Sequence, residues 1–262
     1  MIHPSAVIAK NAEIHETTYI GPFCIIGDGV KIGENNNLIS HVSIVGDTTI
    51  ENSNTFYPFC SIGSEPQDLK YNKEKSYLKI GSNNKFRENV TVNPGTSGGG
   101  LNTIIADNCL FMVGSHVAHD CILGTGVIMA SGALLGGHVV LGSRCFIGGG
   151  TGVHQFCRIG SYAIVGSLSM ITVDVAPCLM VTQRNEVNGL NKVGLKRASF
   201  DRESIKDLKA CYQGLFSRGD ANLKRRAAEM LQEGACGSSE LGEQFLKFFE
   251  NGKRGFARPR ND

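Results

Sequence analysis

One six-residue period runs through most of this chain and limits what it can fold into. A large apolar residue recurs every six positions from Ile2 to Ile62, returns in the same register at Ile80, and has shifted by one position at Ile105. Because apolar residues make up only 41% of the chain, chance does not explain such a run. The period holds at 26 positions: Ile2, Ile8, Ile14, Ile20, Ile26, Ile32, Leu38, Ile44, Ile50, Phe56, Ile62, Ile80, Phe86, Val92, Ile105, Phe111, Val117, Leu123, Met129, Leu135, Leu141, Ile147, Val153, Ile159, Val165 and Ile171.

Two other positions of the six-residue unit keep the same phase. Glycine often follows the large apolar residue directly, and a small residue usually stands four positions after it. Eleven of the 33 glycines occupy the first of these positions, which favours regular turns over disorder as the reason for the glycine content. These eleven are Gly21, Gly27, Gly33, Gly63, Gly81, Gly124, Gly136, Gly142, Gly148, Gly160 and Gly166.

A period of six fits neither an α-helix, at 3.6 residues per turn, nor an isolated strand, at two. It fits a short strand followed by a tight corner, so that three units form a triangular coil of about 18 residues. The sequence therefore predicts a mainly β fold, a parallel β-helix with the large apolar residues inside it. The resemblance of these hexads to the hexapeptide-repeat transferases implies that the coil is left-handed, against the usual right-handed rule for crossovers.

Composition excludes several classes of protein. The net charge is only +2, which does not indicate nucleic-acid binding, and no apolar run is long enough for a membrane span. The N-terminus lacks the basic and apolar segments of a signal peptide, so we expect a cytoplasmic protein. Six of the nine cysteines, at 24, 60, 109, 121, 145 and 157, occupy the small position of the hexad, which predicts buried unpaired thiols.

The repeat is interrupted twice and then ends. Residues 63–79 are polar and charged and are expected to project as a loop, and a second break surrounds Gly98. After Gly194 the pattern becomes helical, with helices predicted at about Arg202–Ser217, Ala221–Glu233 and after Ser239. We thus predict a β-helix domain over 1–194 and a small helical domain over 195–262. The second is basic, with 14 Lys and Arg against 10 Asp and Glu.

Four of the seven histidines fall within 39 residues of one another, at 116, 119, 138 and 154. Residues 18 apart stack in successive coils, so His119 should lie beside Gly137 and Gln155, and Asp120 beside His138. This arrangement suits acyl transfer: His119 as a general base, Asp120 as the acid that orients it, and the Gly137 N–H as a donor to an oxyanion. The plainer alternative is that these histidines only cover an exposed edge, as we expect for His3, His15 and His41.

Five motifs make the predicted function more specific. In order along the chain they are QDLKY at 67–71, HVAHDC at 116–121, GGHV at 136–139, HQF at 154–156 and GLKR at 194–197. Together they resemble the acyl carrier protein (ACP)-dependent UDP-N-acetylglucosamine O-acyltransferases of lipid A biosynthesis, over the whole chain. The resemblance implies transfer of a 3-hydroxyacyl chain from ACP to the glucosamine 3-position of UDP-N-acetylglucosamine. It also implies a homotrimer with active sites between neighbouring subunits, and no metal or coenzyme, since the phosphopantetheine arm of ACP carries the acyl donor.

The resemblance also assigns roles to individual residues. It implies His119 as the base, Asp120 as its support and the Gly137 amide as the oxyanion donor. Substrate contacts are implied for the residues that match the family's other motifs, and Gly149 and Ser167 match its acyl-length ruler. Those contact residues are Gln67, Asp68, Lys70, His116, His138, His154, Gln155, Asn191 and Arg197.

Some positions depart from the family pattern. Pro94 stands where the family usually has Arg, Ala198 replaces the second Arg of a pair, and Val193 replaces an acidic residue. Ser167 stands at a position where the family members that use long acyl chains have Gly. We therefore expect this protein to prefer a shorter acyl chain.

Three alternative functions remain open on the sequence alone. A hexapeptide-repeat carbonic anhydrase would bind zinc through three histidines between subunits, but the loop at 63–79 and the helical tail argue against it. The related N-acyltransferase has an additional N-terminal uridine-binding domain, whereas here the repeat begins at Ile2. A non-enzymatic solenoid scaffold would not need His119.

Overall fold

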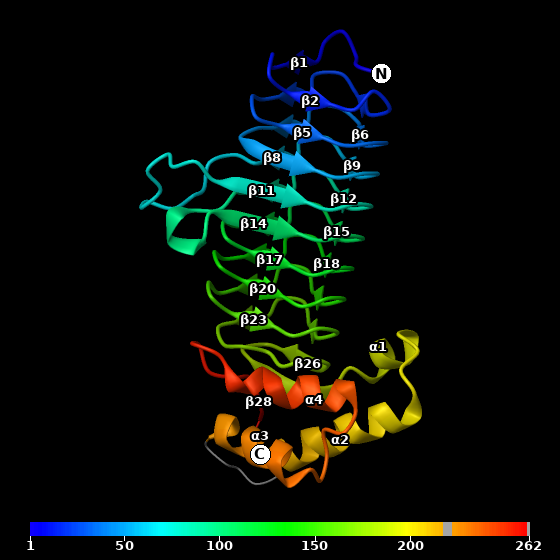
Figure 1. Ribbon diagram of the computed structural model, residues 1–262, viewed down its shortest axis with the longest axis vertical. Helices are drawn as coiled ribbons and strands as arrows, with labels where there is room; N and C mark the ends of the chain where they lie inside the picture. The colour runs from blue at the N-terminus through cyan, green and yellow to red at the C-terminus, as the bar shows by residue number, and fades with distance from the viewer. Residues whose placement is uncertain (217–221, 261–262) are drawn as a thin grey trace.

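A computed structural model describes residues 1–216 and 222–260, and it shows a triangular prism of short strands with helices at one end (Figure 1). The strands of the described chain form three sheets, of nine, eight and eleven strands, which run along the three faces of the prism. In Figure 1 the front strands run from left to right while the chain descends, so the coil is left-handed. The predicted left-handed parallel β-helix is confirmed.

Most strands contain only two residues, because each must turn a corner before the next hexad begins. The nine-stranded sheet consists of β1 Val7–Ile8, β4 Ile25–Ile26, β7 Ser43–Ile44, β10 Ser61–Ile62, β13 Thr91–Val92, β16 His116–Val117, β19 Leu134–Leu135, β22 Gly152–Val153 and β25 Met170–Ile171. The eight-stranded sheet consists of β2 Glu13–Ile14, β5 Lys31–Ile32, β8 Asp47–Ile50, β11 Tyr77–Ile80, β14 Asn102–Ile105, β17 Ile122–Leu123, β20 Val140–Leu141 and β23 Arg158–Ile159.

The eleven-stranded sheet continues past the repeat. It consists of β3 Tyr19–Ile20, β6 Asn37–Leu38, β9 Thr55–Phe56, β12 Lys85–Phe86, β15 Leu110–Phe111, β18 Ile128–Met129, β21 Phe146–Ile147, β24 Ile164–Val165, β26 Leu179–Thr182, β27 Glu186–Leu190 and β28 Arg258–Pro259. Strands β26 and β27 pair antiparallel, whereas the other neighbours pair parallel. The sheet therefore ends in a hairpin that carries the chain out of the coil.

The register between coils explains the one-residue shift of the sequence period. Successive coils pair residues 18 apart, as Val7 does with Ile25. Asp47 pairs with Tyr77, thirty residues on, so the first interruption adds two whole hexads and leaves the phase unchanged. Tyr77 pairs with Asn102, twenty-five residues on, so the second adds one hexad and one residue. Strand β11 begins at Tyr77, and the last three residues of the segment predicted to project therefore belong to the sheet.

The interior of the prism contains the large apolar residue of each hexad. From Ile20 onward these side chains are at most 4% exposed, while Ile2, Ile8 and Ile14 are less buried because no coil lies above the first one. Phe56, Phe86 and Phe111 stack in successive coils with ring centroids 4.7 Å apart. The six cysteines of the small position are buried, as predicted, and burial raises the pKa of Cys60 to about 12, so its thiol stays protonated.

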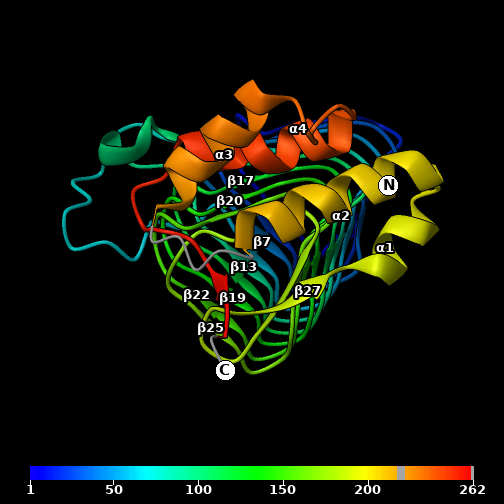
Figure 2. The ribbon, with the colours of Figure 1, turned by 90° about the horizontal axis from the view of Figure 1, so that it is seen from below.

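The helices lie across the lower end of the prism (Figure 2). They are α1 Lys192–Arg197, α2 Arg202–Phe216, α3 Leu223–Glu233 and α4 Glu240–Lys247, with 3-10 turns η1 Ser97–Gly99 in the second interruption and η2 Phe248–Glu250 after α4. The predicted helix ends at Ser217 and Ala221 lie outside the described residues. The predicted boundary at residue 194 falls inside α1, and the division into two domains stays a prediction. In the described chain, no helix is long and apolar enough to cross a membrane.

Candidate active site

A cleft of about 950 Å³ opens on the edge where the nine-stranded sheet turns into the eight-stranded sheet. The projecting loop, on the left in Figure 1, forms its upper wall, and the corners after β16, β19, β22 and β25 form its floor. The cleft is lined by Gln67, Asp68, Leu69, Lys70, Asn93, His116, Ala118, His119, Leu134, Leu135, Gly136, Gly137, His138, Gly152, Val153, His154, Gln155, Phe156, Met170, Ile171 and Thr172.

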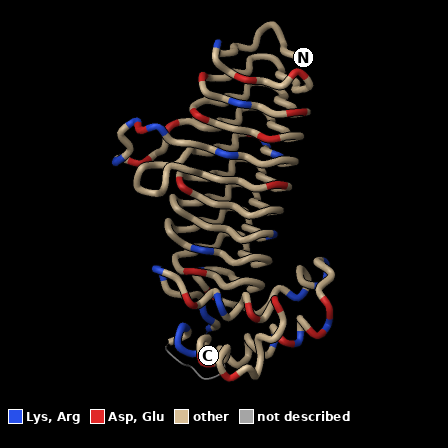
Figure 3. Tube along the Cα trace, in the orientation of Figure 1, with Lys and Arg blue, Asp and Glu red and all other residues tan. Residues whose placement is uncertain are grey.

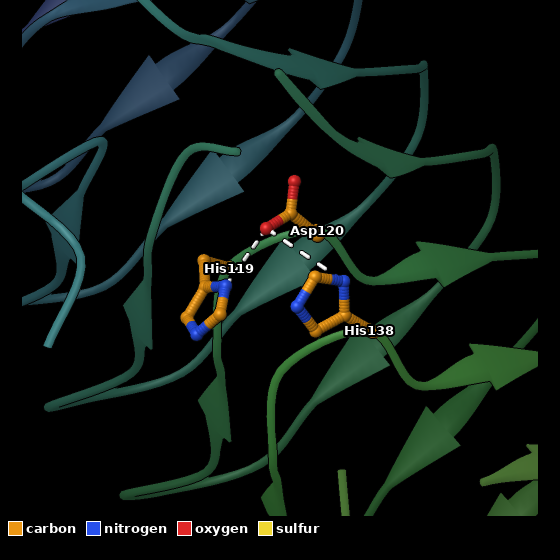
Figure 4. Close-up of side chains that lie close together, drawn as sticks. All are labelled: His119, Asp120 and His138. Carbon is orange, nitrogen blue, oxygen red and sulfur yellow. Dashed lines mark hydrogen bonds and ion pairs between the residues drawn. The ribbon is translucent and has the colours of Figure 1, made fainter. Parts of the chain in front are cut away.

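His119 on the floor of the cleft forms a hydrogen-bonded pair with Asp120, which lies behind it (Figure 4). The distance from His119 Nδ1 to Asp120 Oδ2 is 2.8 Å, and the Asp120 side chain is completely buried. A carboxylate only accepts hydrogen bonds, so Nδ1 of His119 carries the proton when the ring is neutral. Nε2 then has a free lone pair, as a general base requires.

Thr96 also fixes the Asp120 carboxylate. Its amide donates to Asp120 Oδ1 at 2.9 Å and its hydroxyl donates to Oδ2 at 2.6 Å. Burial alone would raise the pKa of Asp120, but the hydrogen bonds from His119 and Thr96 outweigh it, and the pKa is lowered. Asp120 is therefore held ionised and oriented at neutral pH, where it can stabilise a protonated His119.

The corner conformation places this pair. Asp120 has φ of 60°, a left-handed conformation that Asp tolerates better than most residues, and its amide is fixed by the Thr103 hydroxyl at 2.8 Å. One coil below, a Cβ on Gly137 would lie 2.5 Å from Cε1 of His119. Only glycine therefore lets the backbone come this close to the imidazole. In the described chain the Gly137 N–H donates to no other atom, so it is available to a ligand.

Two further histidines lie near the pair in different surroundings. His138 Nδ1 is 3.9 Å from Asp120 Oδ2, and its ring stacks on Phe156 at 4.3 Å. His116 Nδ1 lies 2.7 Å from the Thr91 hydroxyl. Burial lowers the pKa of both histidines, and the nearby His119 lowers that of His116 further. Both rings are therefore favoured as neutral groups at pH 7, suited to hydrogen bonding with a substrate.

The structure brings together most of the residues predicted to form the site. Nine line the cleft, and Asp120 lies directly behind it; the nine are Gln67, Asp68, Lys70, His116, His119, Gly137, His138, His154 and Gln155. Asn191 and Arg197 do not line this cleft, and helix α1, which contains Arg197, lies on the side opposite the projecting loop (Figures 1 and 2). Gly149 and the exposed Ser167 lie on another corner, between the eleven- and nine-stranded sheets.

Asn191 also has a structural role within the chain. Its side-chain oxygen accepts from the Gly194 amide at 2.9 Å and caps helix α1, and its Nδ2 donates to the Tyr162 carbonyl at 2.7 Å. Arg197 lies in the last turn of the same helix and is exposed.

Sequence reasoning missed the support that Thr96 and Thr91 give to Asp120 and His116. Thr96 lies in the second interruption, where no hexad register predicts which residues meet. The contact of Thr91 with His116 could have been predicted, because the two residues pair in neighbouring coils. They are 25 residues apart, since the inserted segment lies between them. The close approach of Gly99 to the Asp120 carboxylate was also missed, since a Cβ at Gly99 would lie 2.0 Å from Asp120 Cγ.

His119, Asp120 and His138 could also approach a metal ion together. Their candidate ligand atoms lie within 4.8 Å of one another, and in the part of the chain that the structure describes this is the one such group of three. Asp120 Oδ2, however, already accepts hydrogen bonds from His119 and Thr96. A metal ion would have to displace the first of these bonds, so the arrangement fits an oriented base better than a set of metal ligands.

The buried histidines predict how the free energy of unfolding depends on pH. Because the folded-state pKa of His116 and of His138 is below the ordinary value of 6.5, the unfolded chain binds more protons once the pH falls below about 6.5. Stability should therefore decrease from pH 7.5 to pH 5, before the lowered pKa of Asp120 contributes at more acid pH. Urea unfolding at fixed protein concentration measures this decrease.

Replacing the two histidines separates their contribution from that of other groups. The double variant His116→Gln, His138→Gln should lose less stability than wild type over the same pH interval. The exposed His3→Gln serves as the control and should leave the pH dependence unchanged. An equal decrease in wild type and the double variant would contradict the assignment.

The chain is similar to known acyltransferases over nearly its whole length. The family described as UDP-N-acetylglucosamine O-acyltransferase, domain 2, matches residues 174–257, and bacterial transferase hexapeptide repeats match residues 102–137. The chain is 44% identical to the acyl-ACP–UDP-N-acetylglucosamine O-acyltransferase of Thermodesulfovibrio yellowstonii, covering 98% of this chain and 99% of that protein. It is 41% identical to the enzyme of the same name from Xanthomonas euvesicatoria, covering 98% of both. The crystal structure of UDP-N-acetylglucosamine O-acyltransferase from Moraxella catarrhalis superposes with a TM-score of 0.93 at 39% identity, covering 98% of this chain and 99% of that one.

Proposed function

Because the chain belongs to the acyl-ACP–UDP-N-acetylglucosamine O-acyltransferase family, we propose that it transfers a 3-hydroxyacyl chain from ACP to UDP-N-acetylglucosamine. The acceptor is the glucosamine 3-hydroxyl, and the reaction is the first step of lipid A biosynthesis. The observation that carries the proposal is the His119–Asp120 pair, whose imidazole lines the cleft beside a free backbone amide.

In the proposed mechanism, His119 Nε2 takes the proton from the sugar hydroxyl while the hydroxyl oxygen attacks the carbonyl carbon of the thioester. Asp120, bonded to Nδ1 at 2.8 Å, stabilises the imidazolium that forms. The new C–O bond gives a tetrahedral intermediate, whose oxyanion is stabilised by the Gly137 N–H. When the C–S bond breaks, the imidazolium returns its proton to the thiolate of the phosphopantetheine arm. No metal or coenzyme takes part in these steps.

The remaining cleft residues fit two polar substrates. Asp68 and Lys70 on the projecting loop face the cleft opposite His138, His154 and Gln155, and together they offer donors and acceptors to sugar hydroxyls, phosphate and amide groups. The Lys70 amide donates to Asp68 Oδ1 at 3.0 Å, which holds that carboxylate in place. Gln67 of the same loop and His116 of β16 also line the cleft. We assign these seven residues to binding of the nucleotide sugar or the pantetheine arm.

A homotrimer would complete this site. Asn191 and Arg197 are assigned to the nucleotide by family resemblance, yet α1 lies across the prism from the projecting loop (Figure 1). A neighbouring subunit that packs against the cleft could bring its own Arg197 close to a diphosphate, which suits a guanidinium. The partners of this chain are therefore proposed to be ACP, UDP-N-acetylglucosamine and two further copies of itself.

We also propose that the protein works in the cytoplasm as two domains, the coil over 1–194 and the helical part over 195–262. The nine free thiols, eight of them buried, suit a reducing compartment.

One assay tests the proposed function. Purified protein is incubated with 3-hydroxyacyl-ACPs of different chain length and UDP-N-acetylglucosamine, and the acylated nucleotide sugar is detected by mass spectrometry. The 3-amino analogue of the sugar is tested in parallel. Absence of any acylated product would contradict the proposal. Carbon dioxide hydration with stoichiometric zinc would support the carbonic anhydrase alternative instead, and activity in neither assay would leave the scaffold alternative.

The side chain at position 167 predicts which acyl-chain length the protein prefers. Gly149 and Ser167 lie in one column, since the Leu168 amide bonds to the Gly149 carbonyl in the coil above at 2.8 Å. Gly149 leaves room beside the coil, whereas the exposed Ser167 side chain would obstruct a longer chain. Ser167→Gly should therefore shift the preference of kcat/KM towards longer acyl-ACPs, by about tenfold for one or two added methylenes. The exposed Ser131→Gly, one coil above Gly149, is the control, and an unchanged chain-length profile in Ser167→Gly would show that this ruler is wrong.

A further inference from the structure

The chain after η2 returns to the β-helix, runs close to the cleft and enters β28. We call residues 251–258 the strap. In Figures 1 and 2 it lies on the same side of the prism as the projecting loop. Asp174 in the last coil bonds to the strap on both sides: its amide donates to the Gly255 carbonyl at 2.9 Å, and its carbonyl accepts from the Ala257 amide at 2.8 Å. β28 then pairs with β27, so the end of the strap is also fixed.

A buried ion pair fixes the beginning of the strap. Arg158 of β23 donates from Nε to Asp174 Oδ2 at 2.8 Å, and the Asp174 side chain is completely buried. The same guanidinium lies 4.3 Å over the Phe248 ring and donates to the carbonyls of Phe248 and Asn251. These contacts connect the coil to η2 and to the first residue of the strap. The fold therefore determines the position of the strap between its two attachments.

Between those attachments, Arg254 reaches two residues of the cleft. Its Nε donates to the Gln155 carbonyl at 3.1 Å, and its Nη2 contacts the His154 ring at Nδ1 and lies 3.2 Å from Nε2. A guanidinium can only donate, so a ring nitrogen of His154 accepts from it. Its planar fork spans both partners at once and restricts the rotation of the imidazole and the Gln155 peptide together.

Charge adds a second reason to connect the strap with the cleft. Charged residues are sparse in the coils between the projecting loop and the helices, and more frequent in the loop and in the C-terminal part (Figure 3). Burial is the main cause of the lowered pKa of His138, but Lys253, next to Arg254, lowers this pKa further and Asp68 of the projecting loop raises it. The strap thus brings two cations to the lower side of a cleft whose upper wall is the loop.

We propose that Arg254 is a positioning residue for acyl transfer, which acts by holding His154 and the Gln155 peptide in the orientation that binds substrate. It connects the C-terminal part of the chain to a site otherwise built from the coil. The inference rests on the proposed function, since it assigns a role within the same cleft. His154 is not the base, so losing Arg254 should weaken substrate binding and leave the chemical step nearly unchanged.

The test compares Arg254→Gln with Arg260→Gln, an exposed arginine two residues beyond the strap whose ion pair is with Glu186. His154→Ala first identifies the substrate that His154 contacts, as the one whose KM it raises. Arg254→Gln should raise the KM of that same substrate about tenfold, the size expected for one charge-assisted hydrogen bond, with kcat within about twofold of wild type. Arg260→Gln should match wild type in both constants.

A double variant distinguishes positioning through His154 from an independent contact. In the His154→Ala background, Arg254→Gln should have a much smaller effect than it has alone, because the two changes remove one shared interaction. An undiminished effect in that background would overturn the inference, and so would an unchanged KM in Arg254→Gln.

Two further comparisons show which conclusion each result supports. Arg254→Lys, which retains a charge and a donor but not the fork, should give a KM between those of wild type and Arg254→Gln. If Arg254→Gln does not fold, Arg254→Lys is tested in its place. A KM of Arg254→Lys equal to that of wild type would then overturn the inference. Wild-type protein is measured throughout. Its inactivity with both substrates would contradict the proposed function itself, whereas an active wild type with an unaffected Arg254→Gln contradicts only the role of Arg254.

Discussion

Replacing His119 with alanine should reduce kcat for acyl transfer by about a thousandfold or more, since general-base catalysis commonly contributes two to four orders of magnitude. The variant removes the ring that faces the cleft and leaves the Asp120 carboxylate bonded to Thr96. We expect the coil to persist, because the His119 side chain is not part of the apolar interior. The measurement is single-turnover formation of acylated nucleotide sugar.

The control for this experiment is His15→Ala, which removes an exposed histidine of the first coils. Its kcat and KM should equal those of wild type. The unfolding midpoint of His119→Ala should stay close to that of wild type, which separates loss of the base from loss of the fold. Activity of His119→Ala near the wild-type level would exclude His119 as the base and favour an acceptor activated by another cleft residue.

Asp120→Asn should have the second large effect, about a thousandfold on kcat, by changing which nitrogen of His119 carries the proton. In wild type, Oδ1 accepts from the Thr96 amide while Oδ2 accepts from His119 Nδ1. An asparagine that keeps its oxygen on the Thr96 amide presents its NH2 group to Nδ1. His119 would then accept at Nδ1 and carry its proton on Nε2, where it can no longer take one from the sugar.

A control variant distinguishes the effect of orienting His119 from the effect of simply removing a negative charge. Asp28→Asn neutralises an exposed carboxylate and should leave kcat unchanged. KM for both substrates should change little in Asp120→Asn, because Asp120 lies behind the cleft and not on its surface. A variant with raised KM and normal kcat would instead show that Asp120 shapes the binding surface and does not control the base.

The sequence predicted which residues surround the proposed catalytic pair, because the hexad period acts as a measure of distance. Residues 18 apart stack, so His119 had to lie beside Gly137, and Asp120 beside His138, without knowledge of any side-chain contact. The structure confirms both neighbours, through the close approach of Gly137 to the imidazole and the 3.9 Å between Asp120 Oδ2 and His138 Nδ1. Where the period is interrupted this reasoning fails, and Thr96 is the clearest case, since nothing in the sequence relates it to Asp120.

The sequence alone therefore determined the coil, its interior and the edge on which the histidines gather. Each of these depends on local periodicity, which repeats the same backbone geometry from one hexad to the next. The tertiary structure decided what no period describes: the turn that places Thr96 on Asp120, and the C-terminal strap that returns across about 100 residues to bring Arg254 to His154. Contacts of that kind depend on how two irregular segments pack in three dimensions, and a repeating pattern contains no information about them.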